Sequence, residues 1–250
     1  MKQNHQGFIK WKINKKIFKL DDYKLNNNNA EKISKQSLKK LCKHYTHISP
    51  ENIYSFFKMN RIIWNSFEGI GIDLGGGVGL VSSILAKKKK VIKIYCVEVV
   101  KNAVVKCQPI VKKKILKTDK EKVISVFGSF DNIELPNSSV DFCVAWDAMH
   151  HSRNLNKTLK EANRVLKKNG KFIIVDRAHN NSTTDGEINR MLNVTYSKDF
   201  LKSNHLPTNK VLTRRMNGEK EYRFKDWKIF FKKTGFKILE EVVIKEKHRK

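Results

Sequence analysis

The run Asp73-Leu-Gly-Gly-Gly-Val-Gly79 is the stretch of this chain best suited to hold a ligand, and it follows a short apolar segment. Glycines permit positive φ angles and let a ligand approach the backbone where a Cβ would obstruct it. A helix that begins after Gly79 would point free N–H groups and its positive end at that ligand. This run therefore predicts a site for a polar or anionic group between a strand and a helix.

Glu98 closes the next apolar segment, residues 91–97, and it follows Gly75 by 23 residues. In nucleotide-binding βαβ units, an acid at about this distance accepts hydrogen bonds from the ribose hydroxyls. A helix N-cap is the alternative role for this side chain. The last glycine of the dinucleotide fingerprint is replaced by Leu80, which disfavours a nicotinamide cofactor.

The histidine pair His150-His151 follows a fourth apolar segment, which ends in Trp146-Asp147. A neutral imidazole can take a proton from an O–H or N–H nucleophile, so either histidine is a candidate base and Asp147 a candidate partner. The alternative is that the pair forms only a wall of the pocket.

Asp176, Arg177 and His179 end a fifth apolar segment and are candidates to orient a substrate. Together with the histidine pair, Asp176 and His179 offer metal ligands. Helical or C-x-x-C ligand spacing is absent, so we expect no metal site.

Alternating strands and helices must position these residues. Apolar and capping patterns predict strands over residues 69–74, 91–97, 122–127, 141–146, 171–175 and 236–244. They predict helices over residues 31–46, 50–64, 80–86, 104–115, 155–166, 189–201 and 224–233. This alternation is typical of an α/β fold with a mostly parallel, doubly wound sheet, whose ligands bind at the carboxyl ends of the strands.

The two flanks of this pattern are less regular. Residues 1–66 are expected to form an N-terminal helical extension, with a loop at DDYKLNNNN, whereas residues 8–18 fit a strand or an interfacial helix equally well. Residues 67–250 form the main domain. Within it, residues 179–222 hold no clear strand and are expected to form a lid-like insertion after the fifth strand.

Three segments carry a resemblance to a known family: residues 73–79, GSFDNIELPNSSVDF at 128–142 and LNKTLKEANRVLKKNG at 155–170. In order and spacing they resemble class I S-adenosylmethionine (SAM)-dependent methyltransferases of the type 11 group, which includes quinone-biosynthesis and other small-molecule enzymes. The resemblance spans about residues 68–178. It implies a Rossmann-like fold, SAM as cofactor and S-adenosylhomocysteine (SAH) as product.

The resemblance also implies which residues contact the cofactor. They are Asp73, Gly75, Gly76, Gly77, Gly79, Glu98, Ser129, Phe130 and Trp146. Two positions depart from the family pattern: Ser129 replaces the usual acid, and Asn169 replaces a proline. The Ser129 hydroxyl, the nearby backbone or Asp131 must then meet the adenine amino group, while Phe130 can stack on the base.

The net charge of +28 is spread evenly, because residues 1–70, 71–180 and 181–250 carry +9, +11 and +8. Only 9 of the 52 basic residues are arginine, although nucleic-acid sites favour arginine. We therefore expect no dedicated nucleic-acid site, and an anionic substrate or a membrane surface stays open as a partner. The four cysteines form no C-x-x-C pair and no long apolar run or signal sequence is present, so reduced thiols and a cytoplasmic location are expected.

These observations predict a SAM-dependent methyltransferase with a small-molecule acceptor, for which a sugar or lipid-linked metabolite is one candidate. The alternatives are an RNA methyltransferase, which would bind RNA with strong salt dependence, and a non-catalytic SAM- or nucleic-acid-binding module. The sequence does not reveal the oligomeric state.

Overall fold

A single parallel sheet is the centre of the computed structural model, which describes residues 7–46, 50–203, 206–209 and 211–244. Its strand order is β1-β4-β3-β2-β5-β6, and all of its described pairings are parallel. The strands are β1 (Ile9–Lys10), β2 (Gly69–Leu74), β3 (Val91–Glu98), β4 (Val123–Phe127), β5 (Val140–Trp146) and β6 (Leu166–Val175). The predicted doubly wound α/β fold is confirmed.

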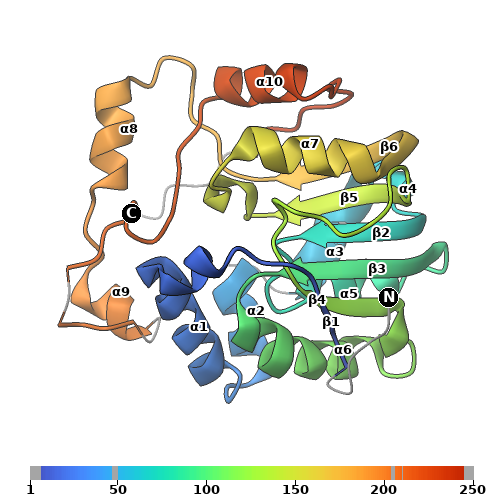
Figure 1. Cartoon of the computed structure of the whole chain (residues 1–250), viewed down its shortest axis with the longest axis horizontal. Helices are drawn as coiled ribbons and strands as arrows, with labels where there is room; N and C mark the ends of the chain where they lie inside the picture. The colour runs from blue at the N-terminus through green and yellow to red at the C-terminus, as the bar shows by residue number, and fades with distance from the viewer. Residues whose placement is uncertain (1–6, 47–49, 204–205, 210, 245–250) are drawn as a thin grey trace.

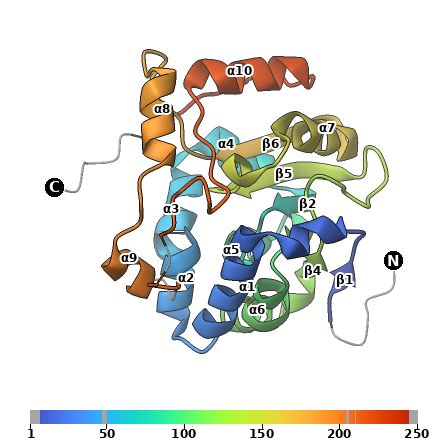
Figure 2. The same cartoon turned by 60° about the vertical axis from the view of Figure 1, so that its left-hand side comes forward.

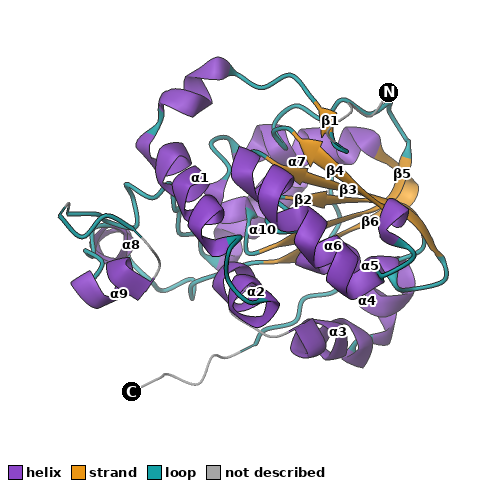
Figure 3. Ribbon diagram, turned by 90° about the horizontal axis from the view of Figure 1, so that it is seen from below, coloured by secondary structure: helices purple, strands orange, loops and turns teal. Residues whose placement is uncertain are grey.

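Helices cover both faces of the sheet (Figures 1 and 3). One face packs against α5 (Leu80–Ala86) and α6 (Gln108–Leu116), and the N-terminal helices extend the same core. These are α1 (Asp21–Ile33), α2 (Leu38–Thr46), α3 (Pro50–Met59) and α4 (Arg61–Ser66). The other face packs against α7 (Leu155–Val165) and α10 (Phe224–Lys233). Both faces of the central strands are thus buried, which explains their apolar composition.

The carboxyl ends of the strands all meet at one edge because the strands are parallel. In Figure 1 the strand arrows point toward the side on which α1, α8 (Asp185–Leu192) and α9 (Lys198–Ser203) lie. Figure 2 shows α8 and α9, in orange, standing apart from the sheet. The strand order reverses between β2 and β5, so the glycine run after β2 lies at the switch point where open α/β sheets bind ligands.

The asparagine tract was predicted to be a loop, and this is wrong: residues 26–29 lie within α1. Asparagine is a weak helix former, so tertiary contacts must supply the stability. Asn27 provides two of them, since its Oδ1 accepts from Asn102 N–H and its carbonyl accepts from Asn102 Nδ2, both at 2.9 Å. Ala30 and Ile33 of the same helix are buried in the core.

The predicted strand over residues 236–244 is also wrong, because this stretch pairs with no described strand. It is held by side chains instead: Asn60 Nδ2 donates to Glu240 at 2.6 Å, and Lys228 pairs with Glu241 at 3.0 Å. The alternating apolar pattern satisfied the local requirement for a strand, but a strand also needs a partner. The sixth strand of the sheet is instead β1. It belongs to residues 8–18, whose sequence fitted a strand and a helix equally well.

Two of the predicted helices have different boundaries in the structure. The helix predicted over residues 155–166 ends at Val165, and β6 begins at once, with Asn169 at a φ of 65°. The helix predicted over residues 189–201 is two helices, α8 and α9. None of the four cysteines forms a disulfide. Among the described helices, none combines the length and apolar character needed to cross a membrane.

Candidate functional site at the carboxyl edge of the sheet

The glycine run forms a tight turn between β2 and α5. Gly75, Gly77 and Gly79 have φ angles of 77°, 50° and 79°, in the left-handed region that other residues rarely adopt. A Cβ on Gly75 would lie 2.6 Å from Ala148 Cβ, and a Cβ on Gly76 would lie 2.5 Å from Cys96 Sγ. Backbone angle and crowding both require glycine in this turn.

Glu98 lies beside this turn, at the end of β3, with its carboxylate held by backbone donors. Gly77 N–H donates to one oxygen at 3.0 Å and Val100 N–H to the other at 2.8 Å. Each carboxylate oxygen has a second lone pair, which is directed away from these amides and can accept from a ligand hydroxyl. Burial raises the pKa of Glu98, while the amide hydrogen bonds oppose that rise.

Asp73 lies beneath the turn and is 1% exposed. Ser82 Oγ donates to its Oδ2 at 2.6 Å, whereas no described residue donates to its buried Oδ1. Burial raises the pKa of Asp73 to about 7. An ionised carboxylate with one unpartnered buried oxygen is costly, so this position suits a ligand group that donates hydrogen bonds.

Phe130 approaches the glycine turn, whereas Ser129 and Trp146, which were also expected to contact the cofactor, make contacts within the protein. A ring carbon of Phe130 would lie 3.5 Å from a Cβ on Gly75. Ser129 Oγ accepts from Asp131 N–H at 3.2 Å. The ring of Trp146 packs instead against Phe56 and Phe57 of α3, with centroids 5.2 and 5.4 Å away. Contacts of Ser129 and Trp146 with a cofactor stay predictions.

His150 is 1% exposed and both of its ring nitrogens are engaged. Its Nδ1 lies 2.7 Å from Asp176 Oδ1, and its Nε2 contacts the Arg177 guanidinium. Arginine has only donors, so Nε2 accepts and the proton resides on Nδ1. Burial alone would raise the pKa of Asp176, but the hydrogen bond from His150 and backbone donors hold it below its usual value. These contacts make His150 a structural group rather than an accessible base.

His151 differs from its neighbour because its side chain is exposed and no described residue hydrogen-bonds its ring. The two imidazole centroids are 4.2 Å apart. Although the residue as a whole is exposed, protein atoms crowd its imidazole, and this partial loss of water together with the neighbouring His150 lowers the pKa of His151. The imidazole is therefore neutral at pH 7 and its lone pair is available to a ligand.

Asp147, His150 and Asp176 place one potential metal-ligand atom each within 4.8 Å of one another. Arg177 already supplies positive charge to this group, because its Nε lies 3.3 Å from Asp147 Oδ1 and its Nη2 contacts His150. The cluster therefore forms an ion-pair network in this structure.

Two glutamates that the sequence did not single out extend this network: Glu221 is buried and Glu219 is half-buried. Glu219 Oε2 accepts from Arg177 at 2.9 Å and from Arg214 at 2.9 Å. Burial raises the pKa of Glu219, but the hydrogen bond from the Tyr196 hydroxyl and the two arginines lower it to about 2. Glu221 accepts from His179 at 2.6 Å and also contacts Arg214. The alternation Glu-Lys-Glu-Tyr at residues 219–222 was a weak signal that both glutamates face the same way.

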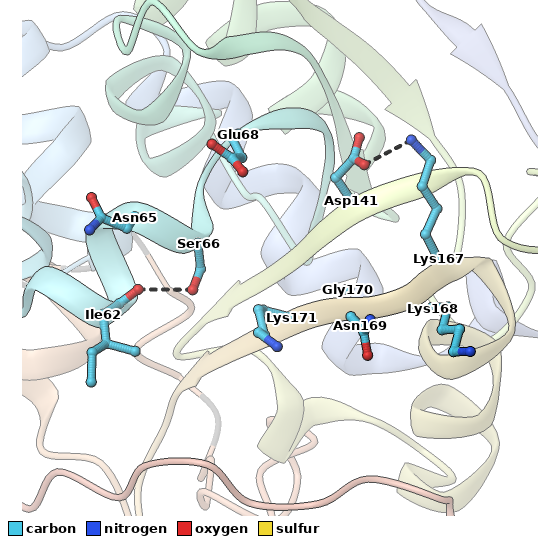
Figure 4. Close-up of a pocket in the computed structure, with 10 residues that line it drawn as sticks. All are labelled: Ile62, Asn65, Ser66, Glu68, Asp141, Lys167, Lys168, Asn169, Gly170 and Lys171. Carbon is cyan, nitrogen blue, oxygen red and sulfur yellow. Dashed lines mark hydrogen bonds and ion pairs between the residues drawn. The ribbon is translucent and has the colours of Figure 1, made fainter.

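A cavity of about 440 Å³ lies at the opposite edge of the sheet, where β5 and β6 begin (Figure 4). Lys167 pairs with Asp141 at its rim, at 2.8 Å. The cavity is remote from the glycine turn and Glu98, and its lysines are surface groups. It therefore adds nothing to the candidate site.

Comparison with known proteins assigns the central part of the chain. Residues 72–174 match the family model described as a methyltransferase domain. These residues form a methyltransferase domain. The matched range contains the glycine turn, Glu98 and the histidine pair.

Curated and solved relatives agree with this domain. A sarcosine/dimethylglycine N-methyltransferase from Aphanothece halophytica is 36% identical over 70 residues, which is 28% of this chain and only 25% of the relative's length. A proposed methyltransferase from Bacillus halodurans is 17% identical with a TM-score of 0.55, over 76% of this chain and 70% of that one. A proposed sarcosine dimethylglycine methyltransferase from Galdieria sulphuraria is 20% identical with a TM-score of 0.52, over 74% and 58%. The two structures support the class I methyltransferase fold.

The methyltransferase domain implies SAM as its cofactor, and the side chains at the carboxyl edge fit that molecule. SAM carries an ammonium, a carboxylate and a ribose diol. Asp73 Oδ1 is a buried acceptor without a described donor, Glu98 presents two further acceptor positions, and the glycine turn leaves no Cβ in the way. When bound, SAM supplies a methyl group on a sulfonium, which a nucleophile displaces in line.

Proposed function

We propose that this chain transfers the methyl group of SAM to a small molecule that carries a basic nitrogen. One observation supports the binding of SAM above all others. The Glu98 carboxylate is held by the Gly77 and Val100 amides beside a glycine turn with left-handed backbone angles. Two backbone donors hold the carboxylate before a ligand arrives, so little ordering is needed on binding.

Charge supports an amine as the acceptor. Four carboxylates face two guanidiniums in the network around the histidine pair: Asp147, Asp176, Glu219 and Glu221 against Arg177 and Arg214. These carboxylates outnumber the guanidiniums of the network, in a chain whose net charge is +28. A cationic amine would be attracted to them. The names of two relatives, which include sarcosine and dimethylglycine, agree with an amine acceptor.

The residues of this chain would then have separate roles. The glycine turn and Glu98 bind the cofactor, and the ion-pair network around Arg177 holds the side chains next to the acceptor in place. An ammonium must first lose one proton, which passes to water. The neutral nitrogen then attacks the methyl carbon, the C–S bond breaks to release SAH, and the methylated nitrogen carries the positive charge. The lowered pKa of His151 makes it a weak base, so we assign it the task of accepting a hydrogen bond from the acceptor's N–H.

Release of SAH from SAM tests this function directly. We expect turnover with small secondary amines such as sarcosine and none with sugars or phenols of similar size. Turnover of RNA that weakens steeply with salt would favour an RNA methyltransferase instead. Tight SAM binding without turnover of any acceptor would favour a binding module.

His151→Ala is expected to lower kcat/KM for the amine about 10-fold, because one hydrogen bond to the acceptor is lost. SAH affinity should not change. His151→Gln, whose amide oxygen can also accept, should recover part of the loss. A fall of 1,000-fold or more would assign proton removal to His151, and an unchanged kcat/KM would show that it does not touch the acceptor.

A further inference from the structure

Gln108, the first residue of α6, lies against the glycine turn and is fully buried. Its Nε2 donates to the Gly77 carbonyl at 2.9 Å. The opposite amide orientation would place two oxygens against each other, so the nitrogen must face Gly77. Gly77 is thus held at both polar backbone atoms, by Gln108 at its carbonyl and by Glu98 at its N–H.

The local chain is shaped to bring Gln108 to this place. A π-helical turn, Ala103–Cys107, directly precedes it, and Gln108 N–H donates to the Ala103 carbonyl. Such turns are rare and occur frequently at functional sites. On the other side, a Cβ on Gly79 would lie 3.3 Å from Gln108 Cγ. The glycine at position 79 therefore leaves room for the glutamine side chain.

The oxygen of the same amide has no hydrogen-bond partner among the residues that the structure describes. Gln108 Oε1 is buried and no described residue donates to it. An unsatisfied buried acceptor is destabilising, and an apolar side chain of equal length would avoid the cost. The cost of the unpartnered oxygen offsets the stability gained from the hydrogen bond to the Gly77 carbonyl. Folding stability alone thus gives little reason for a glutamine at position 108, whereas fixing the position of the Gly77 peptide does.

We propose that Gln108 is a positioning residue for the cofactor: it fixes the Gly77 peptide and thereby the glycine turn and the Glu98 carboxylate that receive SAM. This inference rests on the function proposed above. It assigns a role to a side chain outside the matched glycine and acidic motifs, and it predicts that binding and stability respond in opposite directions when the amide is removed.

Gln108→Met keeps the length of the side chain and removes both the donor and the unpartnered oxygen. We expect SAH binding, measured by calorimetry on the full chain, to weaken about 10-fold while the Tm stays equal or rises. Gln108→Glu, which places an oxygen against the Gly77 carbonyl at pH 8, should weaken binding at least as much. Gln36→Met, which changes a partly exposed glutamine between α1 and α2, is the matched control and should change neither quantity.

The outcomes separate this inference from the proposed function. If the wild-type protein binds SAH and Gln108→Met binds it with the same affinity, the role of Gln108 would be overturned and the proposed function would stand. A parallel loss of Tm and affinity would also overturn it, because that result describes ordinary core packing. If the wild-type protein bound no SAH, the proposed function would fail and this inference with it.

Discussion

His150→Ala is expected to lower the free energy of unfolding by about 2–4 kcal/mol, from the loss of a buried ring and of a hydrogen bond to a charged group. The imidazole links Asp176, whose side chain is 2% exposed, to the Arg177 guanidinium. Without it, one carboxylate oxygen loses its side-chain donor and the guanidinium loses an acceptor. Urea unfolding followed by circular dichroism measures the change.

Two related variants show whether the network is the cause. His150→Asn can keep a donor near Asp176 and should recover part of the stability. His151→Ala removes the adjacent, exposed imidazole and should change the free energy of unfolding by no more than about 0.5 kcal/mol. Equal losses at the two histidines, or none at His150, would contradict the structural role that we assign to His150.

Gly75→Ala is expected to destabilise the protein by about 2–4 kcal/mol and to abolish measurable SAH binding. Its φ of 77° costs an alanine about 1–2 kcal/mol. The added Cβ would also lie 2.6 Å from Ala148 Cβ, which is fixed to the backbone and cannot swing away. The turn must therefore shift, and Phe130, which lies next to it, must shift as well.

Gly186→Ala is the matched control, in helix α8. A Cβ there would meet only Thr184 Oγ1, at 3.9 Å, among the described residues, and the backbone is outside the left-handed region. Alanine should raise stability by up to about 1 kcal/mol because it lowers the entropy of the unfolded chain. If both glycine variants behaved alike, the argument from the turn geometry would be wrong.

Sequence patterns of neighbouring residues were sufficient to predict those parts of the fold whose structure does not depend on distant segments of the chain. The glycine turn between β2 and α5 and the acid at the end of β3 are examples, because their spacing reflects one βαβ unit. Helix α1 could not be predicted this way, since the Asn27–Asn102 contact joins distant segments. The stretch 236–244 failed for the converse reason: its composition suits a strand, but no described strand pairs with it.

The candidate site shows the same division. Glu98 and Asp73 could be singled out because an acid at the end of a buried strand is visible in the sequence, and their contact with the cofactor stays a prediction. Glu219, Glu221 and Gln108 were not, because their significance comes from partners that are distant in sequence. The two histidines look equivalent in the sequence, and only the contacts of His150 with Asp176 and Arg177 distinguish a buried support from an exposed, neutral imidazole. Trp146 was assigned to the cofactor from its position, although its ring faces α3.

Calorimetric titration of the wild-type protein and of Glu98→Ala with SAH tests the central claim most directly. We predict micromolar binding by the wild-type protein and at least 10-fold weaker binding by the variant, since a charged hydrogen-bond pair contributes about 1.5–3 kcal/mol. Wild-type affinity should also fall as the pH is lowered through the raised pKa of Glu98, because protonation removes acceptor capacity. Glu68→Ala, which removes an exposed acid from the opposite edge of the sheet, should bind like the wild type. Absence of SAH binding by the folded wild-type protein, or equal binding by Glu98→Ala, would contradict the assignment of this edge as a SAM site.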